Sequence, residues 1–160
     1  MQNKRIALDL QVADILQDAV RAALNDTFQV VTEIKPWNVQ KEALQPDDSL
    51  IGIIPINQGP KNYGYFVTAF NRAVIAKVLA FYGVTETPDR AMLHDAVSEM
   101  TNVLYGMFKT EMNHLGYGFE MSLPTVIDTE WDGQNMEKLI LPFVAEGHRC
   151  RIVVSNVQQQ

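Results

Sequence analysis

This chain of 160 residues is 47% hydrophobic and 20% charged, which is typical of one soluble globular domain with a substantial core. Its formal net charge of -6 argues against duplex nucleic acid as a partner, because neutralising phosphates requires clustered lysine and arginine. The single cysteine, Cys150, rules out an internal disulfide, and we expect it to be a small buried side chain.

The sequence has no recognisable export signal or membrane span. Charges are interspersed too regularly through residues 1–20 for a signal peptide, and no apolar run is long enough to cross a bilayer. We therefore expect a cytoplasmic protein with a single domain over residues 1–155. The polar residues 156–160 are expected to form a disordered tail.

The first half of the chain is expected to combine one helix with a strand pair. Apolar residues recur every three or four positions from Leu10 to Leu24, which predicts a helix over residues 9–24. Residues 30–34 have strand composition, residues 35–49 are expected to be a loop, and residues 50–56 form a buried strand. Within it, Pro55 should either place the strand at a sheet edge or end it. A hairpin loop then leads to a strand over residues 65–70.

The second half predicts two helices and a final strand pair. A helix over residues 71–83 begins with Asn71 as its cap and stops at Gly83. Asp89 caps a longer helix over residues 90–115. Glycine and β-branched residues return at 116–127, and residues 137–157 form two strands joined at 145–148. Neighbouring strands joined by short turns favour an antiparallel sheet packed against the helices, so we predict the α+β class.

The long helix carries an unusual polar stripe. At about 100° per residue, Asp95, Glu99, Asn102 and Gly106 fall on one side, with Lys109 beside them and the apolar residues opposite. The stripe is either the solvated side of the helix or a surface for another molecule. Glycine inside a helix costs about 1 kcal/mol relative to alanine, so Gly106 favours the second interpretation, unless the glycine is needed for packing against a neighbouring strand.

Glu99 and Asn102, three residues apart, are expected to project side by side. The pair has no nucleophile, no second carboxylate placed for glycoside hydrolysis and no set of metal ligands. It can accept one hydrogen bond or ion pair and hold one water. That is sufficient to hydrolyse a phosphoryl group whose metal is supplied by a partner, because phosphoryl transfer depends mainly on positioning.

The remaining polar residues predict no metal site. His94, His114 and His148 are too scattered in the sequence for a zinc pattern. His94 adjoins the stripe and is either a surface residue or a contact for a partner. Lys109 is likewise either a solvated lysine or a contact for a phosphorylated or acidic partner.

The order Asp95-x-x-x-Glu99-x-x-Asn102-x-x-x-Gly106, followed by MFKT and then by SLPTVI at residues 122–127, resembles the CheX branch of the CheC/CheX/FliY chemotaxis phosphatases. Residues 53–83 are similar to that family's strand, hairpin, strand and helix ahead of the motif. The resemblance covers roughly residues 8–155. The chain departs from CheC-type members by having one E-x-x-N motif instead of two, which favours a single-site, CheX-like protein.

The resemblance implies a CheC-like fold and a phosphatase that acts on the phospho-aspartate of a CheY-like response regulator. It implies that Glu99 is the docking carboxylate and Asn102 the catalytic amide that places the attacking water. Asp95, Gly106 and Lys109 are then expected to contact the partner. This chain should bind no cofactor, since Mg²⁺ belongs to the regulator, and it should form a homodimer through its sheet edges. The alternative is a module with the same fold that binds regulators or flagellar-switch components without hydrolysis.

Overall fold

Seven strands form one antiparallel sheet in the part of the chain that the structure describes. The structure is a computed structural model that describes residues 5–133 and 135–157. The strand order is β1-β6-β7-β4-β3-β5, and β2 pairs with β6 on the same side as β1. The strands are β1 (Thr32–Ile34), β2 (Asn38–Gln40), β3 (Ser49–Gln58), β4 (Lys61–Asn71), β5 (Thr125–Ile127), β6 (Lys138–Ala145) and β7 (His148–Asn156). The predicted α+β class with an antiparallel sheet is confirmed.

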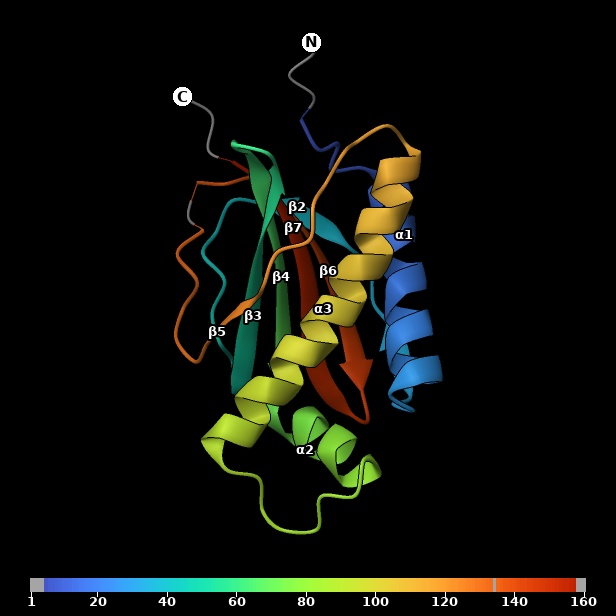
Figure 1. The fold of residues 1–160 in the computed structure, drawn as a ribbon, viewed down its shortest axis with the longest axis vertical. Helices are drawn as coiled ribbons and strands as arrows, with labels where there is room; N and C mark the ends of the chain where they lie inside the picture. Colours follow the sequence, from blue (N-terminus) through green and yellow to red (C-terminus); the bar gives the residue numbers. More distant parts are fainter. Residues whose placement is uncertain (1–4, 134, 158–160) are drawn as a thin grey trace.

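The helices are α1 (Leu10–Val20), α2 (Arg72–Phe81) and α3 (Arg90–His114), and α1 continues into a π-helical segment, η1 (Arg21–Thr27). Figure 1 shows α1 and α3 side by side on one face of the sheet, with α2 across the lower end. No helix in the described ranges has both the length and the apolar character needed to cross a membrane.

Each helix begins at a polar residue that caps it. Asp9, Asn71 and Asp89 each accept a hydrogen bond from a backbone amide two or three residues ahead, at 2.9–3.2 Å. Such caps satisfy donors that have no partner inside the helix, which fixes where the helix starts. The predicted caps Asn71 and Asp89 are confirmed. The predicted stop at Gly83 is also confirmed, because this residue lies two positions beyond α2 with a φ of 95° that glycine adopts without strain.

The edges of the sheet differ from the prediction. β2 lies inside the stretch predicted to be a loop, and Val39 at its centre is exposed, so the sequence carries no apolar pattern there. Pro55 does not end its strand, because β3 continues to Gln58. β5 pairs only with Ile51–Ile53, so at Pro55 the outer side of β3 lies beyond the neighbouring strand. The predicted edge position is therefore not observed for the strand as a whole, because β3 lies between β4 and β5, but β5 does not reach Pro55, where the missing N–H of proline is tolerated.

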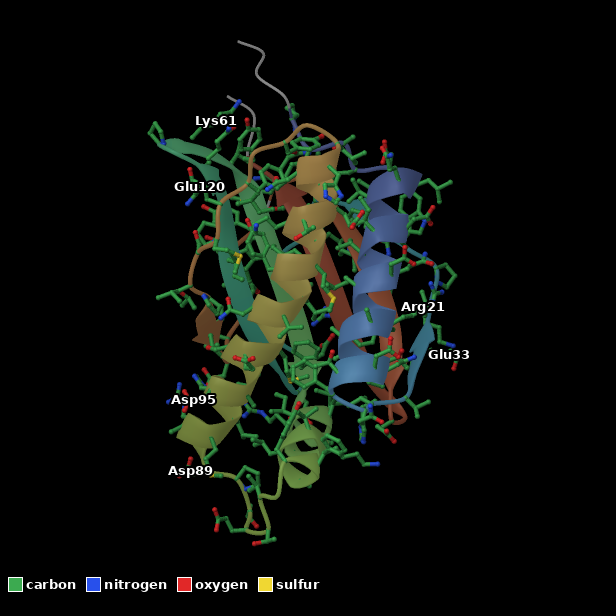
Figure 2. All side chains as sticks on the ribbon, turned by 45° about the vertical axis from the view of Figure 1, so that its right-hand side comes forward. Arg21, Glu33, Lys61, Asp89, Asp95 and Glu120 are labelled. Atoms are coloured by element: carbon green, nitrogen blue, oxygen red, sulfur yellow. The ribbon has the colours of Figure 1, made fainter. Side chains whose placement is uncertain are left out.

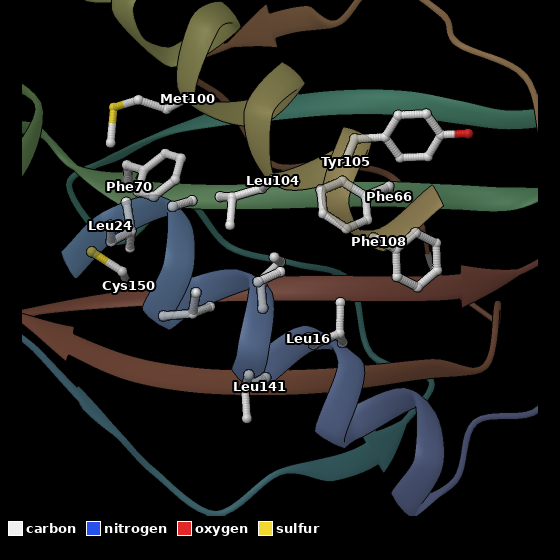
Figure 3. Packing of buried hydrophobic residues seen from close by; sticks show 14 of the residues in the cluster. Leu16, Leu24, Phe66, Phe70, Met100, Leu104, Tyr105, Phe108, Leu141 and Cys150 are labelled. Carbon is white, nitrogen blue, oxygen red and sulfur yellow. The ribbon is translucent and has the colours of Figure 1, made fainter. Parts of the chain in front are cut away.

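The main core lies between the sheet and the two long helices. Figure 3 shows residues of α1, η1, α3, β4, β6 and β7 meeting there, and they include Leu16, Leu24, Phe66, Phe70, Leu104, Phe108 and Leu141. Cys150 belongs to the same cluster with 2% of its surface exposed, as predicted. Its burial raises the pKa of the thiol to about 11.

A smaller core covers the opposite face of the sheet. Trp131 is buried there, pairs with Leu44 in an isolated bridge and meets the Tyr65 ring edge-on at 5.8 Å. Lys138 is buried beside it and donates hydrogen bonds to the carbonyl oxygens of Gly133 and Met136. Burial lowers the pKa of Lys138. The connecting segments that carry Leu44 and Trp131 thus cover this face of the sheet. The face covered by the helices is therefore the candidate for a functional site.

The predicted boundary at residue 155 lies one residue inside the last strand. Asn156 ends β7, and its side chain exchanges two hydrogen bonds with the backbone of Ile6, at 3.1 and 3.0 Å. Asn156 therefore belongs to the domain and not to the tail. Residues 158–160 of the predicted tail lie outside the described residues.

Candidate functional site

The buried side of α3 lies unusually close to the sheet at Gly52 of β3. A Cβ atom at this position would lie 2.4 Å from the Thr101 hydroxyl oxygen and 2.9 Å from that of Thr68, so only glycine fits. The two threonine hydroxyls form a buried hydrogen bond with each other at 2.8 Å. This contact holds α3 against β3 and β4 at the residue directly before Asn102.

The stripe on the other side of the same helix carries two carboxylates. Asp95 and Glu99 are exposed, and neither forms a hydrogen bond or ion pair with another described residue. Figure 2 shows Asp95 on the N-terminal half of α3. Both residues line a pocket of about 340 Å³ between α2 and α3. These carboxylates are therefore available to a cation on an incoming molecule.

Asn102 is less exposed than the predicted stripe suggests. The residue is half buried, and its amide oxygen Oδ1 has essentially no accessible surface and no hydrogen-bond partner among the described residues. A buried carbonyl without a partner costs about 1–3 kcal/mol. Such groups are rare in folded proteins and call for an explanation, one of which is a functional role.

Gly106 faces open space. No atom outside its own helix lies within 4 Å of the position that a Cβ would occupy, so packing against a strand does not require glycine here. It lines a shallow pocket of about 380 Å³ between α1 and α3. Lys109, one turn further along, is half buried and forms no ion pair within the described ranges. The structure thus places both residues on the stripe without giving them a structural role.

The segment that follows α3 returns along the helix on the side opposite the α2 pocket. The Tyr105 hydroxyl donates a hydrogen bond to the carbonyl oxygen of Glu120 at 2.8 Å, and Arg90 forms an ion pair with Asp128 at 3.3 Å. Burial, followed by the charge of Glu120, raises the pKa of Tyr105 to about 12. Residues 120–128 are therefore tied to α3 at both ends, and they flank the half-buried Asn102.

The three histidines do not form a cluster in the described structure. His94 is half buried and accepts a hydrogen bond from Arg90 at 3.4 Å, and His114 lies 3.8 Å from Glu111 at the other end of α3. Across residues 5–133 and 135–157, no group of three His, Cys, Asp or Glu side chains is placed to hold a metal ion.

Sequence reasoning missed Gly52, Thr68 and Thr101, the residues that set the depth of α3 on the sheet. A glycine inside an isoleucine-rich strand is itself a signal of close backbone approach, and it precedes the motif by about fifty residues. The two threonines carry no such signal, because their contact joins residues 33 positions apart.

The arrangement is a rigid helix that presents two unpaired carboxylates, an amide without a partner and a bare glycine. It contains no nucleophile paired with a base. Its groups can form an ion pair with a cation, hold one water through the amide and allow another chain to approach closely at Gly106.

Sequence comparison identifies one family. The sequence profile of the family described as Chemotaxis phosphatase CheX matches residues 50–143, which include β3, β4, α2, the whole of α3 and most of β6. A search of curated proteins found no match.

Similar folds occur in solved structures of chemotaxis proteins. A chemotaxis protein from Desulfovibrio vulgaris Hildenborough superimposes with a TM-score of 0.76 at 18% identity, covering 93% of this chain and 98% of that one. Chemotaxis protein CheX from Vibrio vulnificus gives 0.74 at 14% identity, covering 91% and 98%. The CheX–CheY–BeF3–Mg²⁺ complex from Borrelia burgdorferi gives 0.72 at 18% identity, covering 96% and 100%. At these identities the similarity concerns the fold, which confirms the predicted CheC-like architecture.

Proposed function

This chain belongs to the CheX family of chemotaxis phosphatases, and on that premise we propose that it hydrolyses the phospho-aspartate of a CheY-like response regulator. The neighbour from Borrelia burgdorferi is a complex of CheX with CheY, BeF3 and Mg²⁺, which supports a regulator of the CheY type as the partner. The regulator supplies the Mg²⁺.

In the proposed mechanism Glu99 binds the regulator and Asn102 positions the attacking water. Glu99 is exposed and unpaired, so it forms an ion pair with a cationic side chain beside the phosphoryl group of the regulator. Asn102, three residues further along α3, turns its amide toward that group and holds a water in line with the phosphorus–oxygen bond that breaks. The amide neither gains nor loses a proton overall; it orients the nucleophile, which is the main requirement in phosphoryl transfer.

The single observation that carries the proposal is the unpaired amide oxygen of Asn102. No hydrogen bond from another described residue holds the amide oxygen in its present orientation, so docking does not have to break one. A water bound in the complex would provide the missing partner and recover part of the cost of about 1–3 kcal/mol. An asparagine that served only to stabilise the helix surface would gain nothing from a shielded oxygen.

The alternative of a non-catalytic binding module shares the fold and the carboxylates. It assigns no role to Asn102, because docking through Asp95 and Glu99 does not need a shielded amide oxygen without a hydrogen-bond partner among the described residues. We therefore prefer the enzyme. Contacts of Asp95, Gly106 and Lys109 with the regulator, a homodimer formed through the sheet edges and a cytoplasmic location remain parts of the proposal.

The test is a dephosphorylation assay with ³²P-labelled response regulators and Mg²⁺. The parent protein should accelerate loss of label from at least one regulator. Asn102→Ala should reduce the rate about 10²–10³-fold, equivalent to about 2.7–4 kcal/mol, which is typical of removing one transition-state donor. Glu99→Ala should mainly weaken regulator binding, measured by titration.

A matched control is Glu111→Ala, which removes an exposed carboxylate from the same helix three turns away. It should behave as the parent does. Asn102→Ala with parental activity would show that the mechanism is wrong. Tight binding without turnover at any protein concentration would favour the binding module.

A further inference from the structure

The stripe on α3 is bordered by an aromatic pocket on the side of α2. Among the residues that line this pocket of about 340 Å³ are Phe28, Tyr82, Met92 and Met100, and its charged members are Asp95 and Glu99. Tyr82 is 58% exposed, and its ring meets that of Phe28 edge-on at 6.3 Å. The proposed docking carboxylate therefore stands at the rim of an open apolar pocket.

A second apolar border lies on the opposite side of the stripe. Met121 and Leu123 are 54% and 84% exposed, in the segment that is tied to α3 through Glu120 and Asp128. Isolated exposed apolar side chains are normal, but here Tyr82 is exposed at the pocket on one side of α3, and Met121 and Leu123 are exposed in the segment tied to its other side. Apolar contacts around a charged centre are the arrangement expected of a protein-docking surface.

The charges on this surface decide which partner fits. A second copy of this chain docking through the same face would be related by a two-fold axis, which sets like charges of the two copies close together. The unpaired Asp95 and Glu99 would then lie near their own counterparts, and such juxtaposition is unfavourable. A partner with a cationic side chain beside an exposed apolar one is complementary instead.

We propose that the regulator contacts both sides of α3. One apolar side chain of the regulator enters the pocket lined by Phe28, Tyr82 and Met92, and a second part of the regulator contacts Leu123. This inference rests on the proposed function and adds the groups that provide affinity. The two borders hold the regulator so that Glu99 and Asn102 meet the phosphoryl group. Tyr82 and Leu123 are thus binding residues and take no part in the chemistry.

The experiment compares Tyr82→Ala and Leu123→Ala with the parent, measuring KM and kcat for dephosphorylation and the Kd for a BeF3-loaded regulator. Leu10→Ala is the matched control, because Leu10 is 60% exposed and lies beside Leu115, at the other end of α3 from Asp95. Each test variant should raise KM and Kd about tenfold with kcat changed less than about twofold. The control should match the parent.

The outcomes separate this inference from the proposed function. An active parent whose two variants bind as tightly as Leu10→Ala overturns the docking surface and leaves the phosphatase proposal standing. A fall in kcat at constant KM also overturns it, because these residues would then act on the chemistry. Loss of self-association in place of regulator binding would identify a second copy as the occupant. A parent that neither binds nor dephosphorylates any regulator overturns both proposals. Leu123 is almost fully exposed, so its variant remains informative if Tyr82→Ala disturbs Phe28.

Discussion

Thr101 and Asn102 are neighbours on α3, yet their polar atoms have opposite surroundings. The Thr101 hydroxyl is buried with a partner, Thr68, above the glycine that lets the helix approach the sheet. The Asn102 amide oxygen is shielded and has no hydrogen-bond partner in the part of the chain that the structure describes. We infer that the side of α3 that faces the sheet stabilises the fold. The polar stripe, in contrast, remains available to bind another molecule. Functional sites commonly show such local costs within a well-satisfied scaffold.

Among the substitutions that test this difference between the two sides of α3, the largest effect on stability is expected at Thr101. Thr101→Val keeps the shape but leaves the Thr68 hydroxyl buried and unpaired, which should lower the free energy of unfolding by about 1–3 kcal/mol. The double variant Thr68→Val, Thr101→Val should recover most of the loss, because two apolar groups of the same shape replace both partners. Urea unfolding monitored by circular dichroism measures each free energy.

The matched change on the other side is Asn102→Ala. This variant removes an amide oxygen that has no hydrogen-bond partner within residues 5–133 and 135–157, so we expect its free energy of unfolding to equal or exceed that of the parent. A loss as large as that of Thr101→Val would mean that the amide contributes to stability. The two sides of α3 would then not differ in the way proposed.

How far the sequence predicts this structure depends on the range of the interactions. The helix caps and the orientation of α3 follow from local spacing, and they are confirmed at Asn71 and Asp89. β2 was missed because three residues around an exposed Val39 form a strand only by pairing with β6, about a hundred positions away. The helix predicted over residues 9–24 is confirmed, but from Arg21 the chain is π-helical, in the segment η1, which periodicity does not distinguish from an α-helix.

At the candidate site, too, the features set by local spacing are predictable from the sequence and those set by long-range contacts are not. Periodicity identifies the stripe and places Glu99 on the outside, which the structure bears out. Periodicity cannot reveal that residues 120–128 return beside α3, where they contact Tyr105 and Arg90, nor that Asn102 is half buried. The pocket beside Glu99 also escaped prediction, because it combines residues of α2 and α3 with Phe28 and Tyr82, which directly follow η1 and α2.

A smaller effect is expected at Tyr105, which ties the returning segment to the helix. Tyr105→Phe removes the hydrogen bond to the Glu120 carbonyl and should cost about 0.5–1.5 kcal/mol at neutral pH. The pKa of Tyr105 is raised from 10.0 to about 12, so between these values the unfolded chain ionises first and the parent loses stability as the pH rises. The difference in free energy of unfolding between the parent and Tyr105→Phe should therefore become smaller above pH 10.0.

Urea unfolding of both proteins at neutral pH and at a pH between 10.0 and about 12 checks this expectation. Other groups titrate equally in the two proteins, so the difference between them isolates Tyr105. A gap that stays constant across this range would show that the Tyr105 hydroxyl is not desolvated. The segment beside Asn102 would then be looser than the structure indicates.

A small change in stability is also expected at Gly106, and the sign of this change is the informative part. Gly106→Ala adds a methyl group where no atom outside the helix lies within 4 Å, so the variant should be more stable by about 0.5–1 kcal/mol. If Gly106 is kept for close approach of the regulator, the same methyl group should weaken regulator binding, measured as a higher Kd. A variant that is more stable and also binds as tightly as the parent would remove Gly106 from the docking surface. A less stable variant would show instead that packing in the free protein requires the glycine.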